Sequence, residues 1–473
     1  MSLYDTKIVK IPKMPPKPAV GKSYFDPIHN VDVYRVTSSI EDGHPAEVPP
    51  YSNRPTAQTK KHGNMFLLYL KGPNAGHRFY SAEPPFPRIV DIPWGKYAPD
   101  EAESVWCAGS IMYWMTYIGD FWCVDLDGGA PQLLFSVRSP TNEVFGDTHG
   151  LPSLDGTRGC VSWYVSELEK RLAVFDLRER RLLWEMPYLT PRVTGFQKRT
   201  GTPMMALDGQ FFAVPFPRTD GPGVYFWTFR INGADVKAER ILVADYTYEH
   251  SCQAQIPNGL GGMLDVYLSR TNGAGKNPST WIPSRETEKM SFALLSSFET
   301  NLKETAARLP GSLPQSIPLG DFMPLFSQHA WGPSSGTHLT GGCPGHPSRI
   351  AFSCFAPSNK DYRYDGGYLA CGHQEITIAD LEVAIPTRGM AGFQRVAFTL
   401  GATQASEAPP AYNPAYWCEP HLMFIAEDAV AWGSDYNFHL PQAQWTPGID
   451  TWAAKFPVTS ITSIIGKGKS KKS

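Results

Sequence analysis

A polar turn followed by four to six apolar or aromatic residues recurs along this chain, and the recurrence constrains the fold more than any other feature. The clearest turns are residues 154–156, 207–209 and 257–259, each directly before an apolar segment. Weaker copies are residues 62–64, 108–110, 346–348 and 427–428. Turns placed between apolar segments in this way predict β-hairpins.

The spacing of these turns predicts how the hairpins are arranged. The first five turns lie about 46 to 53 residues apart, a period typical of four-stranded blades around an axis. The last two intervals are nearer 80 to 90 residues, so we expect loop insertions at 271–290, 333–347 and 399–415. The 43 prolines and 42 glycines are too many for long helices or central strands. We therefore predict an all-β fold, a single seven-bladed β-propeller.

The two ends of the chain complement each other. Residues 31–39, VDVYRVTSS, have the pattern of an outer strand without inner partners, whereas the last repeat has few residues left for outer strands. Pairing the two leaves no free sheet edge, so we expect an N-terminal outer strand to close the ring. The predicted organisation is a proline-rich arm at 1–23, a propeller at 24–463 and a disordered basic tail at 464–473.

Composition narrows the classes of function. The formal charge of −2 is unlike the basic balance of a nucleic-acid binder, so we expect no nucleic-acid partner. The first twenty residues lack the apolar core of a secretory signal, and the most apolar stretch, 111–124, is too short to span a membrane. The eight cysteines form no CxxC pair. These features predict a cytoplasmic protein with reduced thiols and no membrane partner.

Histidines occupy one place in several repeats. They lie on the expected inner strand, shortly before the turn, in four separate blades: His149, His250, His329 and His421. Inner strands line a propeller's channel, and convergent imidazoles can bind a transition metal or move protons. Glu419, two residues before His421, is expected on the same face of the strand as a further ligand or base. The alternative is that these side chains only hydrogen-bond water in a polar channel.

These repeats resemble the WD40-like propellers of TolB type and, among enzymes, the oligogalacturonate lyase family. In that family a manganese ion is held by one inner-strand histidine and a Gln-x-x-His-x-His cluster. By position, His329 resembles the first ligand, His421 the last ligand of the cluster, and His250 the base. The cluster's glutamine falls on Tyr416 and its middle histidine on Glu419, so two of four ligands differ. The resemblance implies a divalent metal, manganese or calcium, and an acidic saccharide substrate.

Other propeller lyases use a His/Tyr pair with arginines and no catalytic metal. The residues for such a scheme, with His149 and His250, are Tyr164, Tyr267, Arg158 and Arg270. All these lyases act by β-elimination: a base removes the C5 proton beside the uronate carboxylate, and positive charge stabilises the enolate-like transition state. Channel arginines are natural partners for that carboxylate. Six arginines are expected in or near loops, where a solvated surface position is the alternative use: Arg54, Arg158, Arg218, Arg270, Arg349 and Arg363.

Two other functions stay open. Four histidines from separate blades also hold the iron of carotenoid-cleavage-type oxygenases, although the spacings here differ from that family. A propeller can instead be a scaffold without catalysis that binds a protein or glycan partner. Aromatic residues at 83–94, 362–368 and 409–417 suit such a surface, and equally suit packing between blades. Motifs of nucleotide-binding enzymes, zincins and α/β-hydrolases are absent from the sequence.

Overall fold

The computed structural model describes residues 9–10, 15–39, 41–43, 46–50, 54–71, 76–92, 105–116, 119–137, 144–146, 152–166, 168–189, 203–217, 224–244, 248–257, 261–271, 293–297, 323–324, 336–355, 368–369, 375–384, 393–400, 414–415, 418–435 and 449–458. Within these ranges no helix has the length and apolar character needed to cross a bilayer.

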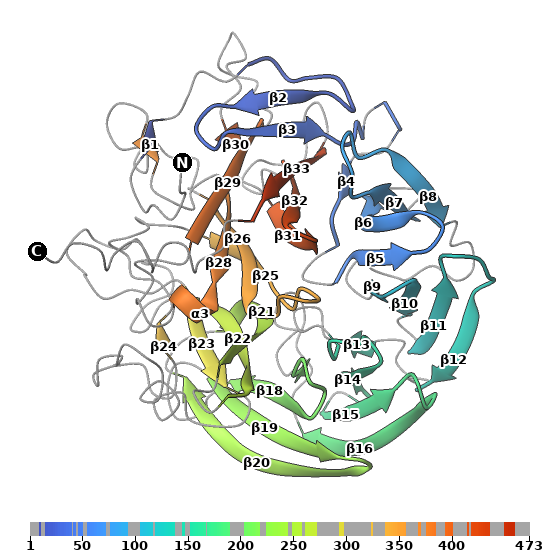
Figure 1. The fold of residues 1–473 in the computed structure, drawn as a ribbon. Helices are drawn as coiled ribbons and strands as arrows, with labels where there is room; N and C mark the ends of the chain where they lie inside the picture. Colours follow the sequence, from blue (N-terminus) through green and yellow to red (C-terminus); the bar gives the residue numbers. More distant parts are fainter. Residues whose placement is uncertain are drawn as a thin grey trace, which may run out of the picture.

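The described residues form almost only antiparallel β-sheet. They build seven sheets of four or five strands, a two-stranded ladder of β1 (Val9–Lys10) and β27 (Tyr368–Leu369), and the short helix α3 (Leu381–Ala384). Figure 1 shows the seven sheets standing in chain order around a common centre. The prediction of a nearly all-β, propeller-like chain is therefore confirmed.

The first three sheets come from residues 46–189. The first contains β4 (Ala46–Val48), β5 (Thr56–Thr59), β6 (Gly63–Lys71), β7 (Gly76–Ser81) and β8 (Arg88–Ile92). The second contains β9 (Val105–Ala108), β10 (Ile111–Met115), β11 (Asp120–Asp125) and β12 (Gln132–Ser136). The third contains β13 (Val144–Gly146), β14 (Arg158–Tyr164), β15 (Glu169–Asp176) and β16 (Arg181–Leu189).

The next three sheets come from residues 204–415. The fourth contains β17 (Met204–Met205), β18 (Phe211–Pro217), β19 (Val224–Asn232) and β20 (Asp235–Ala244). The fifth contains β21 (Tyr248–Pro257), β22 (Met263–Thr271), β23 (Ala293–Ser297) and β24 (Met323–Pro324). The sixth contains β25 (Gly336–Thr340), β26 (Arg349–Phe355), β28 (Glu375–Asp380), β29 (Phe393–Leu400) and β30 (Pro414–Ala415).

The seventh sheet combines the two ends of the chain. Its order is β31 (Cys418–Ile425), β32 (Asp428–Ser434), β33 (Thr451–Pro457), β3 (Val31–Arg35) and β2 (Ser23–Asp26). The register pairs Val33 with Ala454, so the expected pairing of the N-terminal strand with the last repeat is present. In the second, third, fifth and seventh sheets the strand nearest the centre comes first in these lists, and the last lies at the periphery, as Figure 1 shows.

The predicted turns between first and second strands occur where glycine is needed. Gly109, Gly156 and Gly209 have φ values of 60°, 74° and 71°, in the left-handed region that favours glycine. A Cβ on Gly156 would lie 2.6 Å from the Ala108 Cβ of the neighbouring sheet. The Asp155 carboxylate accepts a hydrogen bond from the Thr157 amide at 3.2 Å, which fixes this turn.

Apolar side chains fill the space between neighbouring sheets. Phe66 of β6 stacks on Trp432 of β32, with ring centroids 4.8 Å apart, between the first and seventh sheets. Trp114 and Phe79 are fully buried in the cluster between the first and second sheets. Burying one such side chain stabilises the fold by about 1.5–3 kcal/mol. Packing between sheets therefore accounts for much of the stability.

Hydrogen bonds also join each sheet to the next. The donors and acceptors, in order around the centre, are Gln58 N to Gly109 O (2.9 Å), Trp106 Nε1 to Gly156 O (2.8 Å), Leu154 N to Leu207 O (2.6 Å), Asp208 N to Asp265 Oδ2 (2.9 Å), Gln255 N to Pro347 O (2.8 Å), Thr340 Oγ1 to Pro420 O, and Thr451 Oγ1 to Glu47 O (2.8 Å).

A buried ion network fastens the predicted N-terminal arm to the seventh sheet. The Lys17 ammonium lies 2.7 Å from Asp450 and 3.2 Å from Asp435, and the Arg35 guanidinium lies 2.9 Å from Asp450. Both carboxylates are almost fully buried. Residue 17 is thus bound to the sheet, while the limits of the arm, the propeller and the tail stay predictions. The tail 464–473 lies outside the described residues.

A second buried network joins the outer strands of the sixth and seventh sheets. His29, between β2 and β3, contacts Asp26 at 2.6 Å and Glu375 at 3.0 Å, and Arg395 donates to Glu375 at 2.7 Å. Burial alone would raise the pKa of Glu375, but Arg395 and His29 outweigh it and hold this pKa at about 2. Burial would lower the pKa of His29, but hydrogen bonds to Asp26 and Glu375 raise it.

Because the pKa of His29 is raised on folding, its contribution to stability is complete below its unfolded pKa of about 6.5 and is lost as pH rises through the folded value. We therefore expect His29→Gln to reduce the free energy of unfolding more at about pH 5.5 than at about pH 9, by on the order of 1 kcal/mol. Urea unfolding at both pH values measures this, with His62→Gln in a solvent-facing turn as the control. Equal losses at both pH values would show that His29 is not charged in the folded protein.

Candidate functional site

The candidate site begins at the innermost strand of the fifth sheet. His250 lies near the start of β21, within a register shift: Tyr248 pairs with Thr271, and Ser251 pairs with Ser269. Two residues of β21, one of them His250, therefore lie opposite the single residue Arg270 of β22. A bulge of this kind turns side chains away from the regular alternation and is frequent beside active sites. The backbone thus brings two of the predicted site residues together.

The innermost strand of the seventh sheet has the same irregularity. Its register shifts between Cys418, which pairs with Ser434, and His421, which pairs with Trp432, so Glu419 lies within the shift. Strands β21 and β31 both lie beside β25, the innermost strand of the sixth sheet (Figure 1). The side chains of His250, Arg270 and Glu419 lie outside the described residues.

His421, on this innermost strand, is buried, while its role as a metal ligand stays a prediction. Its side chain is buried, with 1% exposed, and its ring stacks on Trp432 at 5.4 Å between the first and seventh sheets. Its Nε2 lies 2.8 Å from the Pro50 carbonyl. Because a carbonyl only accepts hydrogen bonds, Nε2 carries the proton.

The described part of the expected metal site contains one candidate ligand, His421. A histidine ligand binds through an unprotonated ring nitrogen, and with the Nε2 proton donated to the Pro50 carbonyl that nitrogen is Nδ1. Of the other expected ligands, the Glu419 side chain and the whole of His329 lie outside the described residues. Among the residues that the structure describes, no group of three or more His, Cys, Asp or Glu side chains could hold a metal. A manganese or calcium site stays a prediction for elemental analysis.

Tyr164 lies on the second strand of its sheet and not on the innermost one. It ends β14, is 1% exposed, and pairs in register with Lys170 of β15, whose ammonium lies 5.1 Å from the ring centroid. Burial lowers the pKa of Lys170 to about 7. This position does not place Tyr164 beside His250 or Arg270, so the structure separates it from the candidate site.

The remaining predicted site residues lie outside the described residues: His149, His329 and the side chain of Tyr267. Arg158 pairs with Asp176 at 3.2 Å and donates to the Gly209 carbonyl at 3.2 Å. Arg349 pairs with Asp380 at 3.0 Å. Both arginines therefore have structural partners within or between sheets.

Arg54 is a central residue whose place the sequence did not indicate. It precedes β5, is 3% exposed, and donates hydrogen bonds to the carbonyls of Pro152, Ser153 and Leu154 in the third sheet. Burial lowers its pKa to about 10, while Asp155 and Cys343 act to raise it. Cys343 belongs to the sixth sheet, across the ring, so Arg54 lies among inner strands near the centre. A lone arginine in a loop carries no sequence signal for this role.

No protein family matches this sequence, and no curated protein matches it either. Solved structures do resemble it in three dimensions. An oligogalacturonate lyase from Vibrio parahaemolyticus is 12% identical, with a TM-score of 0.48, and the likeness covers 96% of this chain and 98% of that one. An oligogalacturonate lyase in complex with manganese is 12% identical, with a TM-score of 0.49, and the likeness covers 96% of this chain and 98% of that one. The β-propeller domain of the trilobed protease from Pyrococcus furiosus is 9% identical, with a TM-score of 0.38, and the likeness covers 81% of this chain and 90% of that one. These likenesses are too remote to assign an activity.

Proposed function

We propose that the chain is a closed seven-bladed β-propeller and a lyase that cleaves uronate-containing oligo- or polysaccharides by β-elimination. The observation that carries the activity is the bulge at the start of β21, which places His250 opposite Arg270. Elimination from a uronide needs a base and a cation, and the backbone register brings a residue of each kind onto facing positions of neighbouring strands. The resemblance of the sequence repeats to those of lyase propellers agrees with this activity, but it does not locate any residue of the site.

The proposed blade count and closure rest on the order of the sheets. Seven sheets follow one another, hydrogen bonds join each to the next, and one of these bonds runs from Thr451 of the seventh sheet to Glu47 of the first. The seventh sheet contains strands from both ends of the chain. Because β3 pairs with β33, neither of these two terminal strands is left with an unpaired edge at the point where the ring would close.

In the proposed reaction His250 takes the C5 proton of the uronate unit. The electrons of the broken C–H bond form a C4–C5 double bond while the C4–O bond breaks, and the leaving oxygen gains a proton. The cation of Arg270 binds the substrate carboxylate by charge-assisted hydrogen bonds and stabilises the negative charge that develops on it. Histidine titrates near neutral pH, which suits a general base. No step here passes through a metal ion.

A non-catalytic binding protein is the second candidate, and the burial of His421 favours it. If the inner-strand side chains pack between sheets as His421 does, the centre offers less chemistry than the sequence indicates. Arg54, held by three carbonyls near the centre, also fills space there. Such a propeller would bind a protein or glycan partner on its rim. We also propose a cytoplasmic location, as the sequence predicts.

Incubation with pectic, alginate, ulvan and glucuronan fragments tests the lyase. We expect at least one of them to give the ultraviolet absorbance of a 4,5-unsaturated uronide, with equal numbers of new reducing ends. Binding of a fragment measured by calorimetry, with no absorbance from any fragment, would overturn the lyase and support the binding protein. The matched neutral polymers should give no signal, because they have no carboxylate to acidify the C5 proton.

A further inference from the structure

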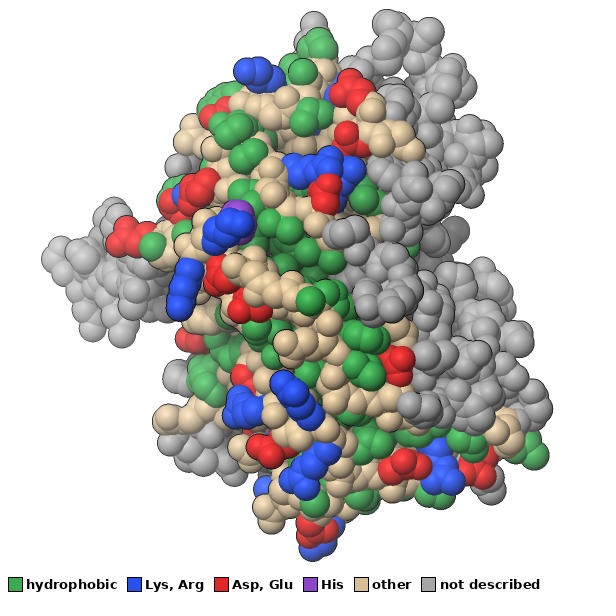
Figure 2. All heavy atoms as spheres, turned by 90° about the vertical axis from the view of Figure 1, so that its right-hand side faces the viewer, with side chains coloured by type: hydrophobic (Ala, Val, Ile, Leu, Met, Phe, Trp, Pro, Cys, Tyr) green, Lys and Arg blue, Asp and Glu red, His purple; other side chains and the backbone are tan. Residues whose placement is uncertain are grey.

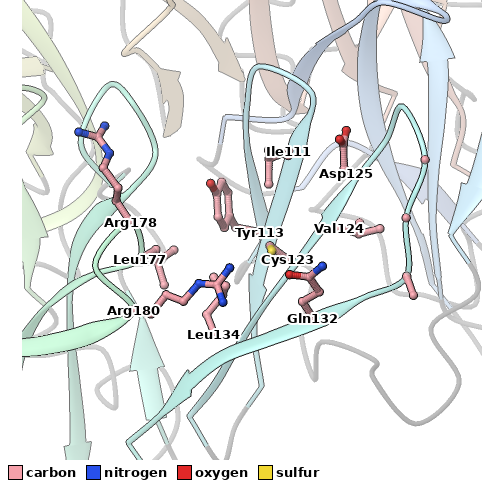
Figure 3. Close-up of a pocket in the computed structure, with 13 residues that line it drawn as sticks. Ile111, Tyr113, Cys123, Val124, Asp125, Gln132, Leu134, Leu177, Arg178 and Arg180 are labelled. Atoms are coloured by element: carbon pink, nitrogen blue, oxygen red, sulfur yellow. The ribbon is translucent and has the colours of Figure 1, made fainter.

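A cavity of about 410 Å³ lies between the second and third sheets, on strands other than those that carry His250 and Glu419. Strands β10, β11 and β12 form one side, and the turn 177–180 between β15 and β16 forms the other (Figure 3). This volume lies within the range of pockets that bind small molecules. The cavity is therefore large enough for one or two sugar rings.

The cavity is open to solvent, and two features of the second sheet shape it. Gly128 and Gly129 have φ values of 146° and 153°, and no atom lies within 4 Å of the place that a Gly128 Cβ would take. Tyr113, on β10 of the same sheet, stacks on Trp106 with centroids 5.9 Å apart and ring planes inclined by 15°. The stacked pair holds the tyrosine ring in place, and the glycines leave the turn between β11 and β12 without side chains.

Polar groups lie above an apolar floor. The floor contains Ile111 and Leu134. In Figure 3 the guanidinium of Arg180 and the amide of Gln132 extend toward each other beside Cys123. The register pairs Cys123 with Gln132, and the charge of Arg180 acts to lower the pKa of the Cys123 thiol, which burial raises. An amide, a cation and an apolar surface thus meet in one space.

The charge of Arg180 is open to a ligand. Arg178, next but one along the turn, is paired with Asp155 at 2.6 Å. Asp125 accepts the amide of Asp127 at 3.0 Å. Within the described part of the chain, no carboxylate lies within ion-pair distance of Arg180. Figure 2 shows basic and acidic side chains interspersed over the face of the molecule that it presents, so recognition here depends on contacts in the pocket and not on a field of one sign.

We infer that this cavity is a binding site for a sugar acid, the uronic acid unit of an acidic saccharide or the free monosaccharide. The ligand's carboxylate pairs with Arg180, a ring hydroxyl bonds the Gln132 amide, and the apolar face of the sugar ring lies against Tyr113 and the floor. A sugar acid fits better than an aromatic acid because it has polar groups around its edge as well as an apolar face. The site does not depend on the elimination proposed above.

Protection of Cys123 from alkylation tests this inference directly. Cys123 is partly exposed in the cavity, whereas Cys107 of the same sheet is buried and serves as the internal reference. The full chain is treated with iodoacetamide at about pH 8.5, where thiolate is present, and labelling of each cysteine is read by peptide mass spectrometry. At about 10 mM, which saturates a site of millimolar affinity, D-galacturonate should protect Cys123 strongly, D-galactose hardly at all, and benzoate more weakly than galacturonate.

Variants of one turn separate charge recognition from nonspecific effects. Arg180→Gln should weaken protection by galacturonate at least tenfold, and Arg180→Lys should retain most of it because the charge remains. Arg181→Gln removes the same charge from the adjacent residue, which does not line the cavity, and should change nothing. The inference is overturned by equal protection with galactose, by benzoate protecting as well as galacturonate, by no protection at all, or by equal losses in the Arg180→Gln and Arg181→Gln proteins.

Discussion

Asp450→Asn should destabilise the protein by about 3–5 kcal/mol, the range observed when one partner of a buried ion pair is removed. The Asp450 carboxylate is fully buried and contacts Lys17 at 2.7 Å, the Arg35 guanidinium at 2.9 Å and the Ser39 amide at 2.9 Å. With asparagine in its place, Arg35 loses its carboxylate partner and Lys17 keeps only Asp435. The amide nitrogen would also face donors in place of an acceptor.

Urea unfolding followed by tryptophan fluorescence measures this loss. Asp428→Asn is the matched control, because the Asp428 side chain is 43% exposed and lies 3.6 Å from Lys455, so its loss should cost less than about 1 kcal/mol. Limited proteolysis gives a second readout: cleavage near residues 15–35 should become faster in Asp450→Asn than in Asp428→Asn. A change below about 1 kcal/mol in Asp450→Asn, without faster cleavage, would show that this network does not hold the two ends of the chain together.

The turns and the joining of the ends could be predicted because each has a local chemical cause. Glycine tolerates the left-handed backbone at positions 156 and 209, and Asp155 stabilises the turn by a hydrogen bond to the following chain. The pairing of β3 with β33 follows from an unmatched strand at each end of the sequence. In both cases a short stretch of residues contains the whole signal.

The direction of single side chains could not be predicted in the same way. The expectation that Glu419 and His421 share a face uses the alternation of a regular strand, and the register shift between Cys418 and His421 interrupts that alternation. No residue type marks such a shift in advance. Arg54 shows the same limit, since its partners are carbonyls about 100 residues away in sequence.

The register that joins His250 to Arg270 also has no signature in the sequence. The two residues are 20 positions apart on neighbouring strands, and only the bulge at Glu249 and His250 places them opposite each other. The cavity beside Tyr113 was hidden for a similar reason. Its sequence signals are the paired glycines 128–129 and the arginine-rich turn 178–181, and each taken alone indicates only a hairpin.

The central claim is that His250 is the base of an elimination reaction, and the rate of unsaturated uronide formation by His250→Ala tests it most directly. Using the uronide that the wild-type protein cleaves, we expect the rate to fall by about 10²–10⁴, the usual contribution of a general base, while the melting temperature stays within a few degrees. His62→Ala, the loss of a histidine in a solvent-facing turn, should leave both unchanged. An undiminished rate in His250→Ala, or a fall in rate matched by a large fall in melting temperature, would contradict the account.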